Sequence, residues 1–206
     1  MRRGLALLVV LALAARTSVA AEVVSYKGYT ITGSPADDDG AFFQMVKTGI
    51  DMVDGLPQRL RSLGQLVRDL RYLPAGAAGA DRGGLDDVTA VYIIETLDEA
   101  RGHIAFRRDT GHLAPLHIAL SLVGNGVHAK RHRDYVDARR KAAAEASDAN
   151  RARAAYLEKL VKRTDLNLVA QAECENMAAI RDTLRALDGD ARQIEGISRL
   201  MDRRNC

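Results

Sequence analysis

Residues 116–132 read LHIALSLVGNGVHAKRH, and this stretch determines the architecture that the sequence predicts. Apolar residues recur at helical spacing, and we expect one stripe of them to face the core: Leu116, Leu120, Val123 and Val127. The adjoining face is polar and carries His117, Ser121, Gly124, His128 and Tyr135, with Asn125 and His132 at its edge. Two glycines inside a helix cost about 1 kcal/mol each relative to alanine, which indicates that another segment approaches closely there.

The chain after this stretch keeps a helical pattern almost to its end. We expect helices at 113–140, from about 144 onward, at 166–187 and at 190–203. The stretch 139–153 lacks large apolar residues, so the region 139–160 is predicted to form an exposed helical arm with a solvated, charged face.

The chain before this stretch contains the strand signals. Apolar and polar residues alternate around Gly28, which predicts a strand or hairpin at 23–32. Many β-branched residues predict a strand at 88–95, and a shorter strand is expected at 103–107. Two helices are expected between them: one from Phe42 to Gly55, and one from Pro57 to Pro74 with its apolar face at Leu60, Leu63, Val67 and Leu70. The run AGAAGADRGG at 75–84 predicts a loop.

These elements together predict the α+β class: a small N-terminal β-sheet with helices, followed by a helical C-terminal half. Aromatic residues make up 4% of the chain and tryptophan is absent, so the core must be built from aliphatic side chains, which suits packed helices. We expect a single domain over residues 22–206.

The first 21 residues have the three zones of a secretory signal peptide. Arg2 and Arg3 precede an apolar run at 5–14, and small residues follow at 18–21. The run is about half of the roughly 20 residues that span a bilayer, and no later segment is apolar enough, so no transmembrane anchor is expected. The sequence therefore predicts a periplasmic or secreted protein.

Removal of this segment changes the charge of the chain. Three of the 30 Lys and Arg residues lie in it and none of the 27 Asp and Glu residues does, which leaves 27 of each. The pI of about 9.0 for the full chain is therefore not a sign of nucleic-acid binding. The expected partner is a protein or peptide of unknown identity, and the oligomeric state stays open.

The only two cysteines are Cys174 and Cys206. In an oxidising compartment an even pair favours a disulfide over two free thiols. We therefore expect these residues to close a loop in the C-terminal third of the chain.

The segment 124–129, GNGVHA, resembles the zinc-binding helix of zincin metallopeptidases, His-Glu-x-x-His followed by a small residue. In that family such a helix follows a small sheet, so the resemblance implies a zincin-like fold. His128 matches the second histidine ligand of the motif. Gly124 stands in place of the first histidine, and Asn125 stands in place of the glutamate that acts as general base.

The two replacements remove the chemistry of hydrolysis. Zinc peptidases need about three protein ligands and a base for the metal-bound water. Glycine cannot bind a metal, and asparagine cannot accept the proton. The sequence therefore predicts no catalytic residues in this register and no required cofactor.

A second register keeps a metal site open. His128 and His132 are four residues apart on one helix, a spacing at which two imidazoles can share a zinc ion. Ala129 stands where this register would need its glutamate, so hydrolysis fails here too unless another carboxylate acts as the base.

The resemblance also implies a glutamate ligand from a later helix, for which Glu173 and Glu175 are candidates. The apolar stripe of that helix, Leu166, Ala170, Met177, Ile180 and Leu184, places Glu173 at its centre and Glu175 on the opposite, solvated face. A carboxylate directed at a core needs a partner, which can be a histidine, a metal or one of the many arginines. Glu173 is therefore predicted to face His128.

Three functions remain open from the sequence. The first is a zincin-like pseudoenzyme that binds or regulates a partner through a relict site at Gly124, Asn125, His128 and Glu173. The second is an active metal-dependent hydrolase that uses His128, His132 and Glu173 as zinc ligands. The third is a helical envelope protein without an active site.

Overall fold

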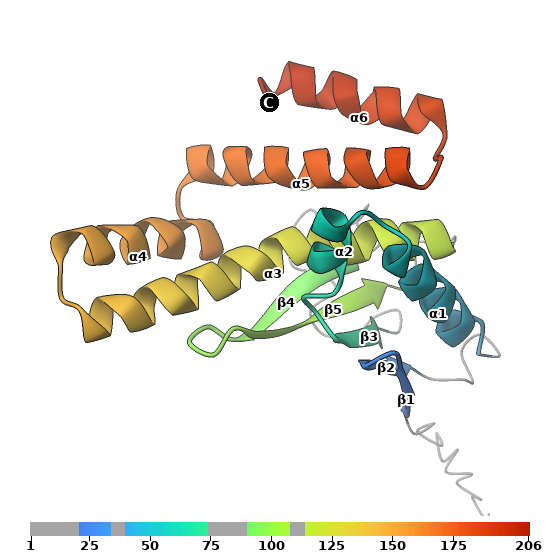
Figure 1. Ribbon diagram of the computed structural model, residues 1–206, viewed down its shortest axis with the longest axis horizontal. Coiled ribbons are helices and arrows are strands. Elements are labelled where there is room, and N and C mark those ends of the chain that lie inside the picture. The colour runs from blue at the N-terminus through green and yellow to red at the C-terminus, as the bar shows by residue number, and fades with distance from the viewer. Residues whose placement is uncertain (1–20, 34–39, 74–89, 108–113) are drawn as a thin grey trace, which may run out of the picture.

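The computed structural model describes residues 21–33, 40–73, 90–107 and 114–206 (Figure 1). The predicted signal segment, apart from Ala21, and the predicted loop at 75–84 lie outside these ranges. The elements follow one another as β1 (Glu22–Tyr26), β2 (Tyr29–Gly33), α1 (Ala41–Asp54), α2 (Gln58–Gly64), β3 (Asp69–Leu73), β4 (Ala90–Thr96), β5 (Arg101–Arg107), α3 (Pro115–Ala144), α4 (Asp148–Val161), α5 (Leu166–Ala186) and α6 (Ala191–Arg203).

The five strands form one sheet in the order β1-β2-β3-β5-β4. β2, β3 and β5 are parallel, while β1 and β4 are antiparallel strands at the two edges. The hairpin predicted around Gly28 is confirmed: Lys27 and Gly28 both have positive φ, 47° and 78°, as a two-residue type I′ turn requires. The two later strands are also confirmed, as β4 and β5.

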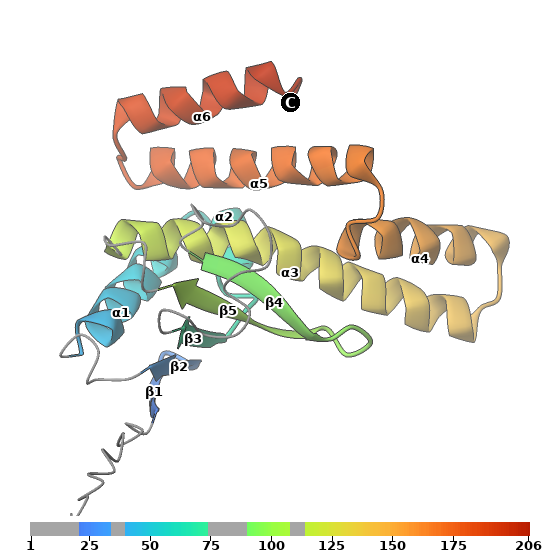
Figure 2. The ribbon, with the colours of Figure 1, turned by 180° about the vertical axis from the view of Figure 1, so that it is seen from behind.

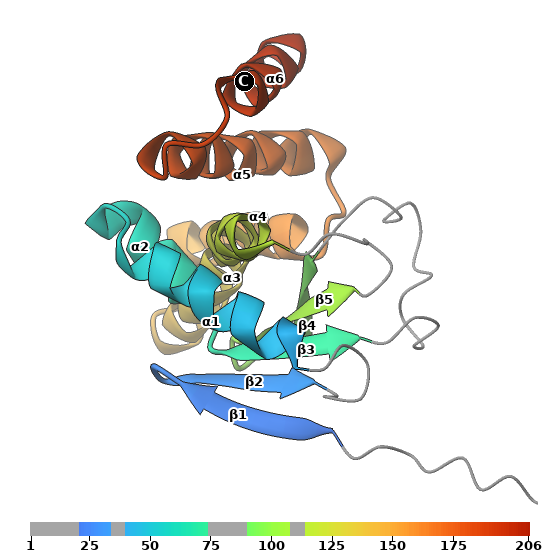
Figure 3. The ribbon, with the colours of Figure 1, turned by 90° about the vertical axis from the view of Figure 1, so that its right-hand side faces the viewer.

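Helices α1, α2 and α3 cover one face of the sheet, and α5 and α6 form further layers beyond α3 (Figure 3). The core lies between sheet and helices, where Ile31, Leu70 and Phe106 meet aliphatic residues of α1 and α3. The α+β class with a helical C-terminal half is therefore confirmed. Among the described residues, no helix combines the length and the hydropathy needed to cross a membrane.

The helix predicted from Pro57 to Pro74 was wrong in its second half. α2 ends at Gly64, whose carbonyl oxygen accepts a hydrogen bond of 3.0 Å from the Tyr29 hydroxyl. The chain then enters β3, where Leu70 is fully buried between β2 and β5. The apolar spacing fits a helix equally well, so only pairing with the neighbouring strands distinguishes the two structures.

The core-facing stripe of α3 also differs from the prediction. Val123 and Val127 are buried as expected, but Leu116 and Leu120 are only half-buried, and Ile118 and Leu122 are fully buried in their place. The reason is that α3 contacts α1, α2, α5 and the sheet on different sides. A single stripe of side chains does not describe a helix that is surrounded in this way.

The two glycines of α3 mark close contacts between helices, as the sequence predicted. A Cβ atom on Gly126 would lie 2.1 Å from the carbonyl oxygen of Leu63 in α2. A Cβ atom on Gly124 would lie 2.8 Å from Oδ1 of Asn176 in α5. These glycines therefore let α2 and α5 approach α3 on two separate sides.

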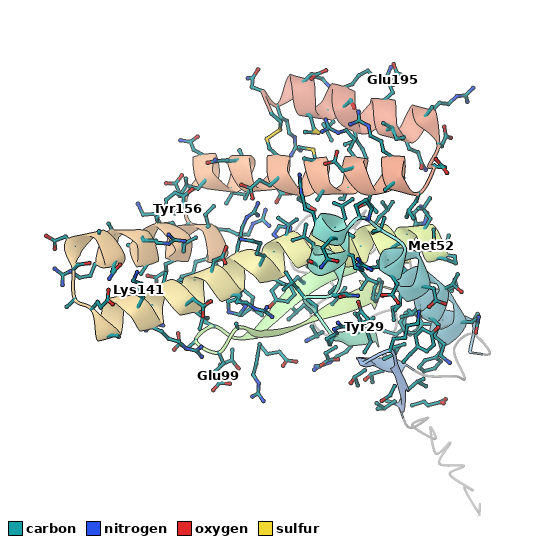
Figure 4. All side chains as sticks on the ribbon, viewed as in Figure 1. Tyr29, Met52, Glu99, Lys141, Tyr156 and Glu195 are labelled. Atoms are coloured by element: carbon teal, nitrogen blue, oxygen red, sulfur yellow. A yellow bond between two sulfur atoms is a disulfide. The ribbon has the colours of Figure 1, made fainter. Side chains whose placement is uncertain are left out.

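The region 139–160 consists of the end of α3 and most of α4, two helices that form a hairpin and meet close to the break expected near residue 144. α3 ends at Ala144, and α4 begins after Ser147, whose hydroxyl accepts a hydrogen bond from the Asn150 backbone N–H. α4 runs back along α3 and buries Leu157 in a small second core with Tyr135 and Val136. Much of α4 stays exposed, including Tyr156, so the predicted solvated face is present on this hairpin (Figure 4).

The predicted disulfide between Cys174 and Cys206 is present. It joins α5 to the chain just after α6, with a Cα–Cα distance of 5.4 Å, and is visible as a yellow bond between the two helices in Figure 4. α6 packs on the side of α5 that faces away from α3 (Figure 2). The disulfide therefore holds the outermost layer of the structure.

The face of the sheet opposite the helices carries a charged network. Arg71 lies 2.6 Å from Oε1 of Glu95 and also pairs with Asp69, while Nδ1 of His103 lies 2.9 Å from the same Glu95 oxygen. Because these groups partner one another across β3, β4 and β5, we interpret the network as a structural contact between strands.

Candidate functional site

A cavity of about 520 Å³ lies between β4, α3, α5 and the segment that joins α4 to α5. We call it the α3–α5 pocket. Its walls are largely aliphatic, and its polar groups come mainly from α3 and α5. The residues that line it are Ala90, Val91, Tyr92, Ile94, His117, Leu120, Ser121, Gly124, Asn125, His128, Arg131, Leu160, Val161, Arg163, Val169, Ala172, Glu173, Asn176 and Ile180.

All four residues of the predicted relict site line this pocket: Gly124, Asn125, His128 and Glu173. His117, Ser121, Gly124 and His128 are three or four residues apart, so they follow one side of α3. Ala172, Glu173, Asn176 and Ile180 follow one side of α5 in the same way. Gly124 is close to Asn176 and Ile180, whereas Arg131 contacts Ala172, so the two helices run antiparallel across the pocket.

His128 is largely buried and lies near Glu173 in the pocket wall. Burial lowers the pKa of His128 below its ordinary value of 6.5; the carboxylate of Glu173 opposes this, while Arg131 and Arg163 add to it. The ring is therefore neutral at pH 7. Within the described part of the chain, the imidazole of His128 makes no hydrogen bond.

Glu173 is directed inward, as predicted, but it also pairs with an arginine. Its Oε1 lies 3.1 Å from Nη2 of Arg163, and 26% of its side chain is exposed. Glu175 is 62% exposed, as expected for the solvated face, and pairs with Arg131 at 2.7 Å. The same nitrogen of Arg131 donates to the carbonyl oxygen of Ala172, so both arginines of the pocket wall have partners.

Side chains of α5 occupy the space beside Gly124, where the resemblance would place the first histidine of the zincin motif. Besides Asn176 Oδ1, the Ile180 Cδ1 atom lies only 3.2 Å from the position of a Cβ on Gly124. Asn176 Oδ1 is buried and has no hydrogen-bond partner among the described residues. The periodicity of α5 could have identified Asn176, because it lies three residues after Glu173 on the same side.

Asn125, which the resemblance aligns with the general base of zincins, is held by its own helix. Its Nδ2 donates a hydrogen bond of 2.9 Å to the backbone oxygen of Ser121. The amide carries no group that can accept a proton from water at neutral pH. This position therefore contributes polarity to the pocket but no base.

His132 does not join His128 and Glu173. It is fully buried, and its Nε2 lies 2.9 Å from the carbonyl oxygen of Leu97, so that nitrogen must donate a hydrogen bond. Nδ1 lies 3.0 Å from the Tyr92 hydroxyl and forms a second hydrogen bond with it. With both nitrogens occupied in the interior, His132 lies outside the pocket lining, and no three His, Cys, Asp or Glu side chains of the described residues are grouped to hold a metal.

Acidification should destabilise the protein through His128. Because the folded state lowers the pKa of His128, the unfolded chain binds a proton that the folded chain does not. The contribution of the neutral His128 ring to the free energy of unfolding is therefore present above pH 6.5, the ordinary pKa of the unfolded chain. It is lost as the pH falls from there through the lower pKa of the folded state. Urea unfolding at pH 7.5 and 5.0 should show a smaller loss in His128→Gln, which cannot titrate, than in the unmodified protein.

An equal loss in both proteins would contradict this assignment. The carboxylates with lowered pKa values, such as those of Asp51 and Glu158, titrate below this window, so they do not produce the difference.

Comparison of the chain with protein-family models, with curated proteins and with solved structures found no match. The residues and the geometry of the α3–α5 pocket are therefore the basis for a functional proposal.

Proposed function

We propose that this protein is a non-catalytic, zincin-like binding protein that holds an extended peptide segment in the α3–α5 pocket. The observation that carries the proposal is the grouping of Gly124, Asn125, His128 and Glu173 in one cavity, with Asn176 in the space of a first zinc ligand. The protein is a relict peptidase in this proposal: it keeps the cleft and lacks the groups for hydrolysis.

The position of the pocket relative to the sheet supports the proposed similarity to zincins. α3 follows β5 directly and packs against the sheet, as the metal-binding helix does in that family, and a later helix supplies the glutamate opposite His128. The resemblance rests on this order and on His128, so it predicts a shared architecture and no retained activity.

The edge strand β4 supports a peptide as the occupant. β4 pairs with β5 on one side, and among the described residues no strand pairs with its other side. Its residues Val91, Tyr92 and Ile94 line the pocket. An extended peptide can add to such an edge through backbone hydrogen bonds while it places side chains in the adjoining cavity.

We further propose that the protein works outside the cytoplasm, in a periplasm or after secretion. The Cys174–Cys206 disulfide is compatible with an oxidising compartment, and the first 21 residues are predicted to be a signal peptide.

The purified protein should bind extended peptides without cleaving them. Two measurements test the alternative of a metal-dependent hydrolase. Mass spectrometry gives the metal content of the protein, and a fluorogenic peptide library, with and without added zinc, reports hydrolysis. Isothermal titration calorimetry with the same library measures binding. Stoichiometric zinc together with hydrolysis that His128→Ala abolishes would refute the proposal in favour of a metal-dependent hydrolase.

Restoring the motif should reduce stability and create no peptidase. In Gly124→His/Asn125→Glu the new imidazole would meet Asn176 and Ile180, and overpacking of this kind costs about 1–3 kcal/mol. In an Asn176→Ala background the same double substitution should cost less, because the nearer of the two side chains beside position 124 is then removed. Equal losses of unfolding free energy in the two backgrounds would show that Asn176 does not fill this position.

A further inference from the structure

Two exposed apolar side chains continue the wall of the α3–α5 pocket onto the surface. Tyr156, labelled in Figure 4, is 44% exposed and lies four residues before Leu160, which lines the pocket from α4. Leu166 is 82% exposed and lies three residues before Val169, which lines the pocket from α5. Residues three or four apart are neighbours on a helix surface, so the apolar wall extends outward by about one turn on both helices. Apolar surface that joins a cavity in this way is typical of a binding groove.

The part of the chain around Tyr156 is basic. Residues 151–163 contain five arginine and lysine residues and one acidic residue. Three of the five form ion pairs, namely Arg151, Lys162 and Arg163. The other two, Arg153 and Lys159, are exposed, and their side chains form no ion pair or hydrogen bond with the described residues. Two positive charges on this part of the surface are therefore available to a binding partner.

These two cations flank the exposed tyrosine. Arg153 lies three residues before Tyr156 and Lys159 lies three residues after it, so the three side chains are neighbours on the solvent-facing side of α4. We call Arg153, Tyr156 and Lys159 the α4 rim. Surface cations without acidic partners attract the acidic groups of a partner, and salt weakens this attraction. The α4 rim and the pocket together therefore fit a partner that carries both apolar and acidic side chains.

We propose that the peptide held in the α3–α5 pocket continues across the α4 rim, with an apolar segment in the pocket and acidic residues beside Arg153 and Lys159. This inference rests on the proposed function, because it assumes that the occupant of the pocket is a peptide. An extended chain advances about 3.3 Å per residue and one helical turn rises about 5.4 Å, so two or three residues beyond the pocket reach the α4 rim.

The test is calorimetry with two blocked peptides, the acidic Ac-Leu-Val-Leu-Asp-Glu-Asp-NH2 and its amide counterpart Ac-Leu-Val-Leu-Asn-Gln-Asn-NH2. Each is also measured with its two halves in the reverse order, so that both chain directions are sampled. At 0.1 M NaCl the acidic peptide, in one of the two orders, should bind about tenfold more tightly than the amide peptide. This preference should fall to about twofold at 1 M NaCl, where the Debye length is about 3 Å.

Variants of the α4 rim locate the preference. Arg153→Glu/Lys159→Glu should remove the preference for the acidic peptide and leave the affinity for the amide peptide unchanged. Arg192→Glu/Arg203→Glu makes the same change of charge at exposed residues of α6 outside the pocket lining, and it should keep the preference. Tyr156→Ala should weaken the binding of both peptides, because it removes apolar surface that either peptide contacts. Circular dichroism checks that each variant is folded.

The outcomes separate this inference from the proposed function. Equal affinities for the acidic and amide peptides, a preference that survives in Arg153→Glu/Lys159→Glu, or undiminished binding by Tyr156→Ala would each overturn the path across the α4 rim and leave peptide binding in the pocket in place. Loss of the preference in the α6 variant as well would show that net charge alone produces it, which also overturns the inference. Failure of every peptide to bind would overturn both proposals.

Discussion

Replacing Gly126 by alanine should destabilise the protein by about 3 kcal/mol or more, at the upper end of the usual cost of overpacking. The new Cβ would lie 2.1 Å from the Leu63 carbonyl oxygen and 2.6 Å from its carbonyl carbon. These are backbone atoms at the end of α2, so no side-chain rotation can relieve the contact. α2 must move away from α3, which opens the core around Val123 and Leu60.

Urea unfolding followed by circular dichroism measures this loss. Gly196→Ala is the matched control, because Gly196 lies inside α6 and a Cβ there meets no atom within 4 Å. Helix propensity alone predicts that the control gains about 0.8–1 kcal/mol. A Gly126→Ala protein as stable as the unmodified one would contradict the packing of α2 on α3 described here.

Removal of the Cys174–Cys206 disulfide should cost about 3–4 kcal/mol of unfolding free energy. The bond joins residues that are 32 positions apart, and closing a loop of this length restricts the unfolded chain by about that amount. The loss of stability should be greatest for α6. This helix packs on α5, and Met201 is its only buried residue.

The double variant Cys174→Ser/Cys206→Ser, compared with the oxidised protein by urea unfolding, measures this contribution. Hydrogen exchange should show α6 losing protection before α3 does, since α3 lies in the main core. A loss below about 1 kcal/mol, with unchanged protection of α6, would show that packing alone holds this layer.

Much of the fold follows from local patterns. The hairpin at Lys27 and Gly28, the strands β4 and β5 and the four C-terminal helices were predicted near their observed positions, because turn residues and apolar periodicity act over a few neighbouring residues. β3 was missed because its burial comes from β2 and β5, which are distant in the sequence. Leu166 was expected to face a core and is 82% exposed, because spacing along a helix does not specify which of its turns another element covers.

The candidate site divides in the same way. The sequence by itself determined that Gly124, Asn125 and His128 share one side of a helix, that Glu173 faces inward and that the two cysteines pair, because helical spacing and composition carry this information. Only the tertiary structure decided that His132 belongs to the interior and that Asn176 fills the space beside Gly124. Those roles depend on which atoms of Tyr92, Leu97 and α5 lie within a few ångströms, and such distances arise when remote segments pack together.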